Sequence, residues 1–198
     1  MRYDREAEEI TRQLPKGLRL AVIGSTSFWG HDSKEICRSV GTQLATLENL
    51  ILLTGGVSGV GETLGRSFFG TRQQLAVVPN TYHILPRGYG SWDYGITLYG
   101  GASMAERREI LGRIAQVYLS IEGGPGTMHE TKVAQSRGAT VVPIGRTGGF
   151  SNDIYNQLNC PDAKLISEWG LLNDSSASVE LLNAAIRHIV EVLARPDC

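Results

Sequence analysis

Short runs of apolar residues alternate along the chain with longer segments of helical periodicity. A run that is apolar at nearly every position is typical of a strand covered on both faces. Such strands are predicted at 18–24, 49–56, 74–79, 116–122 and 140–145. Helices are predicted at 32–48, 59–69, 103–115, 127–138 and 176–194. This alternation predicts an α/β fold, with a doubly wound parallel sheet flanked by helices.

The segment 80–101 interrupts the alternation, and it is long for a loop in a compact domain. Its aromatic side chains could stack a nucleotide base, or they could pack an irregular loop or an oligomer interface. Both interpretations stay open from the sequence. The aromatic residues are Tyr82, Tyr89, Trp92, Tyr94 and Tyr99.

A chain of 198 residues predicts one domain, with its core at about 18–145 and a C-terminal helical segment at about 176–194. The role of 150–198 stays open. The net charge is −1, and without a long basic tract no nucleic-acid partner is expected.

The N-terminal stretch MRYDREAEEITRQL lacks the apolar region of a signal peptide, and no apolar run is long enough to span a bilayer. A cytoplasmic protein without a membrane partner is therefore expected. Cys37, Cys160 and Cys198 are far apart and form no CxxC, and no HExxH occurs. Reduced thiols and no metal site are expected.

Glycine-rich turns follow several of the predicted strands, at 24–26, 54–59 and 123–127. The carboxyl ends of parallel strands meet at one edge of the sheet, where ligands bind. Glycines there let backbone amides approach a phosphate, although they also serve ordinary turns. Neither GxGxxG nor GK[ST] is present, which disfavours a dinucleotide dehydrogenase and a P-loop NTPase.

Thr127 and Glu130 have the spacing of a capping box, in which each side chain bonds the backbone amide of the other. Glu130 can also share the inward face of its helix with Val133 and Ala134, so its carboxylate could face a ligand. The sequence leaves the helix cap and the catalytic acid as two interpretations.

Arg107 and Arg108 interrupt an apolar stripe formed by Met104, Leu111 and Ile114. At least one of these arginines is expected at the buried face, where it needs an anion. The alternatives are a side chain that extends to the rim, or a salt bridge with a glutamate such as Glu106 or Glu109.

The stretch EGGPGTMHE at 122–130 resembles the PGGxGTxxE motif of the LOG proteins, formerly labelled lysine decarboxylase-like. One strand earlier, MAERR at 104–108 is similar to the M-x-x-R-K segment of that family. TGGVSGVGE at 54–62 and GST at 24–26 resemble its other glycine-rich segments. The resemblance covers about 18–145 and implies the wider SLOG group of Rossmann-like nucleotide-binding proteins.

The resemblance implies hydrolysis of the N-glycosidic bond of a nucleoside 5′-monophosphate, of the AMP or N6-modified adenine type met in cytokinin activation. It implies a homodimer and a small-molecule nucleotide partner, with no cofactor. Arg107 would be the catalytic arginine and Glu130 the catalytic acid. The 5′-phosphate would lie on Gly123, Gly124, Gly126 and Thr127. The nucleotide pocket would be completed by Ser25, Thr26, Gly55, Gly56, Met104 and Arg108.

Three positions depart from the family pattern: Glu122 replaces a proline, Arg108 replaces a lysine, and Gly61 stands where relatives often have methionine. A carboxylate beside a phosphate site is unfavourable, so Glu122 is expected to point away or to pair with an arginine. The same superfamily includes molybdenum-cofactor carriers and nucleotide-sensing modules. A non-catalytic carrier or sensor is therefore the alternative to an enzyme.

Overall fold

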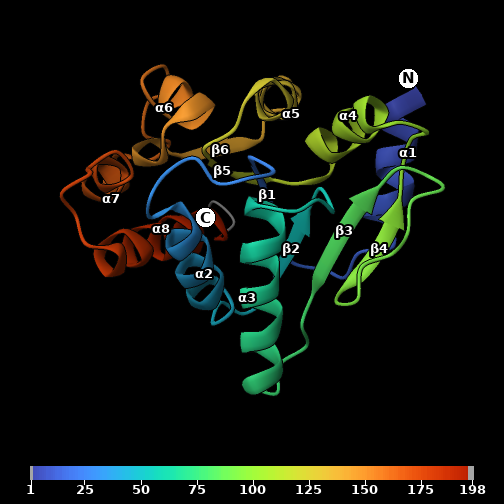
Figure 1. Ribbon diagram of the computed structural model, residues 1–198, viewed down its shortest axis with the longest axis horizontal. Coiled ribbons are helices and arrows are strands. Elements are labelled where there is room, and N and C mark those ends of the chain that lie inside the picture. Colours follow the sequence, from blue (N-terminus) through green and yellow to red (C-terminus); the bar gives the residue numbers. More distant parts are fainter. Residues whose placement is uncertain (1, 196–198) are drawn as a thin grey trace.

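A computed structural model, which describes residues 2–195, contains a six-stranded, all-parallel sheet in the order β4-β3-β2-β1-β5-β6 (Figure 1). The chain runs outward from β1 in one direction through β2 and in the other through β5, so the sheet is doubly wound as predicted. The strands are β1 (Leu18–Gly24), β2 (Leu50–Thr54), β3 (Thr81–Leu85), β4 (Ile96–Tyr99), β5 (Val117–Ile121) and β6 (Thr140–Ile144).

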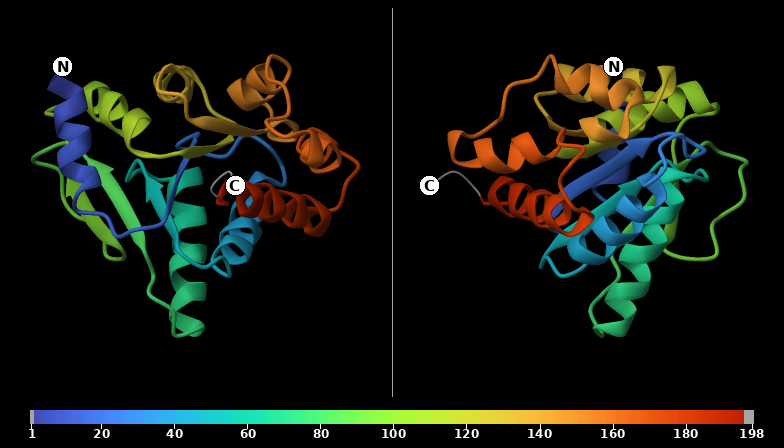
Figure 2. Two further views of the ribbon diagram at one scale, coloured as in Figure 1. Left: turned by 180° about the vertical axis from the view of Figure 1, so that it is seen from behind. Right: turned by 60° about the vertical axis from the view of Figure 1, so that its left-hand side comes forward.

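Helices cover both faces of this sheet, as the views in Figures 1 and 2 show. Along β1, Leu20 and Val22 join one hydrophobic core, and Ala21 and Ile23 join the other. The first core includes side chains of α2 (Ser33–Leu44), α3 (Val60–Gln74) and α8 (Val179–Leu193). The second includes side chains of α1 (Arg2–Thr11), α4 (Met104–Ile114) and α5 (Pro125–Ser136).

The strand predicted at 74–79 is wrong. Helix α3 continues to Gln74, and a turn follows in which Val77 and Val78 are exposed. The guanidinium of Arg72 holds this turn by donating to the carbonyl of Val78 at 3.0 Å and to that of Ala45 at 3.2 Å. A short apolar run does not by itself distinguish strand from turn.

The segment 80–101 is not irregular throughout, because it contains β3 and the edge strand β4. Within it, Trp92 and Tyr94 pack on each other and on His83, which Tyr94 meets edge-on at 4.6 Å, and Arg66 lies 4.5 Å from the Tyr94 ring centre. The imidazole of His83 is hydrogen-bonded to Thr54 Oγ1 at 2.8 Å and to the Tyr94 carbonyl at 3.0 Å. These contacts indicate that the aromatic side chains of this segment pack the loop rather than stack on a nucleotide base.

The charged N-terminal stretch forms α1, which was not predicted. The C-terminal part contains the predicted closing helix as α8, preceded by α6 (Gly149–Tyr155) and α7 (Ile166–Leu171). Short 3₁₀ turns lie at Gly145–Thr147 and Ala163–Leu165. None of the helices within residues 2–195 combines the length and the apolar composition needed to cross a membrane.

Candidate functional site

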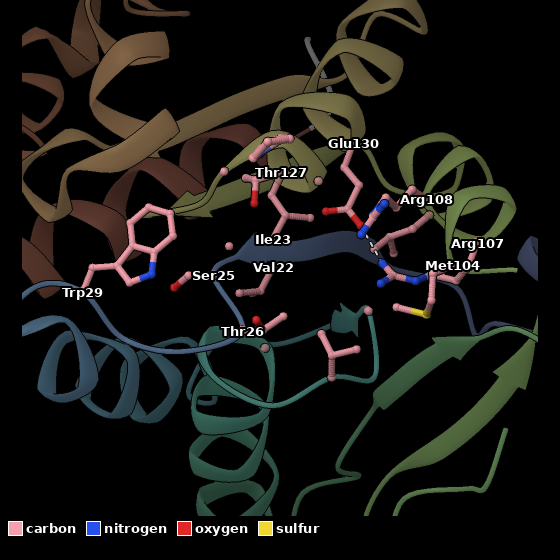
Figure 3. A pocket seen from close by; sticks show the side chains of 18 residues that line it. Val22, Ile23, Ser25, Thr26, Trp29, Met104, Arg107, Arg108, Thr127 and Glu130 are labelled. Atoms are coloured by element: carbon pink, nitrogen blue, oxygen red, sulfur yellow. Dashed lines mark hydrogen bonds and ion pairs between the residues drawn. The ribbon is translucent and has the colours of Figure 1, made fainter.

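A pocket lies at the carboxyl ends of β1 and β5, where the direction of winding changes (Figure 3). This is the position at which doubly wound sheets bind their ligands. Its cavity is about 250 Å³. The lining comes from the end of β1 and the loop after it, the turns after β2 and β5, the start of α3, and the amino-terminal parts of α4 and α5. Lining residues include Ser25, Thr26, Trp29, Gly55, Met104, Arg107, Arg108, Gly124, Gly126, Thr127 and Glu130.

The amino-terminal end of α5 faces this pocket without a side-chain cap. The helix begins at Pro125, Gly124 occupies the cap position, and no acidic residue lies in the first turn. The capping box expected between Thr127 and Glu130 is therefore wrong, because the helix starts before Thr127. The first-turn amides and the positive end of the helix dipole are available to an anion.

Arg107 and Glu130 form a buried ion pair that joins α4 to α5, with Arg107 Nη1 lying 2.5 Å from Glu130 Oε1 (Figure 3). The two residues are only 3% and 6% exposed, yet both line the pocket. The sequence placed an arginine at the buried face correctly, but neither Glu106 nor Glu109 is its partner. Glu106 pairs with Arg2, and Glu109 pairs with Arg113.

Burial raises the pKa of Glu130 above its usual value, and the positive charges of Arg107 and Arg108 oppose that rise. The same burial lowers the pKa of Arg107, which a guanidinium tolerates without losing its proton. A carboxyl group with a raised pKa can exchange protons closer to neutral pH than an ordinary glutamate. This is the property expected of a general acid or base.

Arg108 brings a second positive charge to the pocket lining, next to the start of α5. Its guanidinium makes no hydrogen bond or ion pair with any residue in the described range 2–195. It lies over Gly126, where an added Cβ would stand 3.1 Å from Arg108 Nε. With one carboxylate and two arginines, the pocket has an excess of positive charge beside the end of α5.

The remaining predicted residues divide into those that line the pocket and those that shape it. Ser25, Thr26, Gly55 and Met104 line it. Gly56 and Gly123 are not among the lining residues. An added Cβ at Gly56 would meet Leu85, and one at Gly123 would meet Thr127. Both glycines therefore allow close packing behind the turns, and their contact with a ligand stays a prediction.

Glu122 is not among the residues that line the pocket, and within residues 2–195 its carboxylate pairs with no arginine. Its carboxylate, fully buried, accepts hydrogen bonds from the hydroxyl of Ser25 and from the backbone amides of Trp29 and Gly30. Of the two alternatives expected for Glu122, its place outside the pocket lining agrees with the first, and the arginine partner is not found in the described range. Backbone amides and a hydroxyl satisfy the charge in its place.

Trp29 is the aromatic residue of the pocket lining, and the sequence analysis missed it. It is 58% exposed, and it stands on the loop between β1 and α2. None of the five aromatic residues proposed from the segment 80–101 lines the described pocket. The signal that could have identified Trp29 is its place in GSTSFWG, an aromatic residue within the loop that follows the first strand.

Solved structures with the same fold include TM1055, a structural genomics target. It is 23% identical over 74% of this chain and 87% of its own, with a TM-score of 0.60. The molybdenum cofactor carrier protein of Chlamydomonas reinhardtii is 21% identical over 89% of this chain and 99% of its own, with a TM-score of 0.61. The molybdenum cofactor binding protein of Rippkaea orientalis is 21% identical, with coverages of 88% and 98% and a TM-score of 0.59.

These identities are low, so the similarities establish the fold and leave activity to the site itself. No curated protein matches the chain. A family model describes the SLOG cluster4 family and matches residues 18–169, a range that contains the whole sheet, the pocket and both partners of the buried ion pair. The chain belongs to the SLOG cluster4 family.

Proposed function

We propose that the protein hydrolyses the N-glycosidic bond of a nucleoside 5′-monophosphate, of the AMP or N6-modified adenine type. The observation that carries this proposal is the Arg107–Glu130 pair beside the uncapped amino-terminal end of α5. The helix end suits a phosphate, and the carboxylate lies within the same cavity. A phosphate and a reacting sugar carbon can therefore be held by adjacent parts of one pocket.

In this mechanism the bond between C1′ and the base nitrogen breaks, and its electron pair leaves with the base, which takes up a proton. The positive charge that develops on the sugar is stabilised by the Glu130 carboxylate. Water then adds to C1′, and Glu130 accepts its proton. Arg107 orients that carboxylate, whereas Arg108, which has no partner, supplies charge to the phosphate.

The test is the release of free base and ribose 5-phosphate from a panel of nucleoside monophosphates. Replacing Glu130 by glutamine keeps a hydrogen-bond acceptor for Arg107 but removes the charge. We expect this variant to lose at least about a hundredfold in rate. Glu109→Gln is the matched control, because Glu109 lies on α4 and pairs with Arg113 outside the pocket lining.

If the Glu130→Gln protein cleaves AMP as fast as the unmodified protein, the catalytic role of Glu130 is wrong. If a monophosphate binds tightly but no base is released, the protein is a carrier or sensor. Two of the structural neighbours are named as molybdenum cofactor carrier or binding proteins.

We further propose that the protein is a cytoplasmic homodimer without a nucleic-acid or membrane partner. Sedimentation of the purified protein tests the oligomeric state.

A further inference from the structure

The loop between β1 and α2 is held in place by one buried carboxylate. Glu122 Oε1 accepts from the amide of Trp29 at 2.9 Å and from that of Gly30 at 2.7 Å. Its other oxygen accepts from the hydroxyl of Ser25. Three donors of a single loop therefore converge on one side chain, so the conformation of that loop depends on Glu122.

The backbone of Glu122 is fixed independently of its side chain. Its amide donates to Thr147 Oγ1 at 2.8 Å, and its carbonyl accepts from the amide of Ser151 at 2.9 Å. Its φ of 54° lies in the left-handed region. Glu122 thus connects the end of β5 and the start of α6 with the loop that follows β1.

That loop carries Trp29, whose ring lies against a surface made of glycines. An added Cβ would stand 3.6 Å from the indole at Gly124 and 2.7 Å from it at Gly149. The indole N–H makes no hydrogen bond with any residue of the described range. Trp29 and the Arg107–Glu130 pair lie at opposite ends of the pocket, with Thr127 and Ser25 between them (Figure 3).

We propose that Trp29 contacts the phosphate end of the ligand and that Glu122 is the positioning residue that holds Trp29 there. This inference rests on the proposed function, which puts the phosphate at the start of α5 and the glycosidic carbon at Glu130. The base then lies towards Glu130, and the indole next to Gly124 faces the phosphate. The outer edge of its ring, which is the part nearest Gly124, shields the phosphate from solvent.

Binding of AMP and of ribose 5-phosphate, measured by calorimetry, tests this proposal. All variants are made in a Glu130→Gln background, so that AMP is not consumed. Trp29→Ala should weaken both ligands by a similar factor, about tenfold, because both carry the phosphate. Trp29→Phe should recover part of this loss, since it keeps an aromatic ring, although a smaller one that reaches less far towards Gly124.

Glu122→Gly should reproduce the loss, because glycine accepts the positive φ and keeps the backbone bonds while it removes the carboxylate. Glu122→Gln should retain most of the affinity, because its amide oxygen still accepts from the two loop amides. If Glu122 acts through Trp29, the double variant Trp29→Ala/Glu122→Gly binds no more weakly than Trp29→Ala alone. Trp92→Phe, in the aromatic cluster outside the pocket, is the control for loss of a tryptophan.

Four outcomes would contradict part of this account. Additive losses in the double variant overturn the positioning role of Glu122. A loss confined to AMP overturns the phosphate contact, because Trp29 then serves the base. A protein that binds neither compound before Trp29 is changed overturns this inference and the proposed function together. If the unmodified protein binds AMP in a Trp29-dependent way without cleaving it, only the proposed hydrolysis fails.

Discussion

Glu122 differs from the proline of the LOG motif in its backbone as well as in its side chain. Proline fixes φ near −65° and has no amide hydrogen. Glu122 has φ 54°, and its amide donates to Thr147 Oγ1. Proline therefore cannot adopt the backbone conformation that the first residue of EGGPGTMHE has in this protein. The sequence identified this position as unusual, but the reason became visible only in three dimensions.

Restoring the family residue by Glu122→Pro should consequently destabilise the protein, by roughly 3 kcal/mol or more. The change forces φ out of the left-handed region and leaves Thr147 without its donor. The free energy of unfolding in urea measures the effect, with Glu122→Gly as the comparison that keeps the backbone. A Glu122→Pro protein as stable as Glu122→Gly would show that the positive φ is not required.

The raised pKa of Glu130 predicts how the rate of the proposed hydrolysis depends on pH. If the ionised carboxylate accepts a proton from water, activity falls as acidification protonates Glu130. Because burial raises its pKa, this decline should occur above the ordinary glutamate value of 4.5. A rate profile between about pH 4 and 8 measures it. A decline that lies below 4.5, or that persists in the residual rate of Glu130→Gln, contradicts the assignment.

At the scale of single elements, the turn after β2 constrains Arg107, the arginine of the buried ion pair. An added Cβ at Gly55 would stand 2.6 Å from Arg107 Nη1, so Gly55→Ala must displace the guanidinium from Glu130. We expect about a hundredfold loss of activity, the order found for misplaced catalytic groups, with little loss of stability. Gly70→Ala, on α3 with nothing within 4 Å of the added Cβ, should leave activity unchanged. Full activity in Gly55→Ala would show that hydrolysis does not depend on the position of the Arg107 guanidinium.

The elements that the sequence predicted well are those whose periodicity and local turn signals agree. β1, β5 and α8 are examples, since each lies within about three residues of its predicted range. The prediction failed where an apolar run has another use, as in 74–79, where Val77 and Val78 are exposed in a turn. Arg72 supports that turn through carbonyls of two distant segments, and no local pattern encodes such a contact.

The pocket residues likewise divide into those marked by a local sequence pattern and those placed by contacts between distant segments. Motif residues such as Arg107, Glu130 and Gly124 could be located because their spacing carries information, and the fold brings them to one pocket. Trp29 follows the first strand, but the hydrogen bond between its backbone amide and the distant Glu122 leaves no local pattern in the sequence. The predicted start of α5 is too late because Pro125 occupies the first helical position rather than the preceding turn.

For the molecule as a whole, stability in acid should depend on His83. This side chain is fully buried between β2 and the segment before β4, and burial lowers its pKa from 6.5 to about 4. The unfolded chain therefore takes up a proton near pH 6.5, whereas the folded protein resists it until about pH 4. The stabilisation is fully present above pH 6.5 and is lost as the pH falls towards 4. A shift of this size corresponds to about 3 kcal/mol.

The free energy of unfolding, measured in urea from about pH 7.5 to 4, should fall by that order in the unmodified protein. His83→Gln should lower stability at neutral pH but flatten the dependence, because glutamine does not titrate. Carboxylates whose pKa values are lowered, such as Glu6 and Asp93, add their own acid sensitivity mainly below the ordinary carboxyl range. A slope between pH 6.5 and 5 that is equal in both proteins would assign the acid sensitivity to groups other than His83.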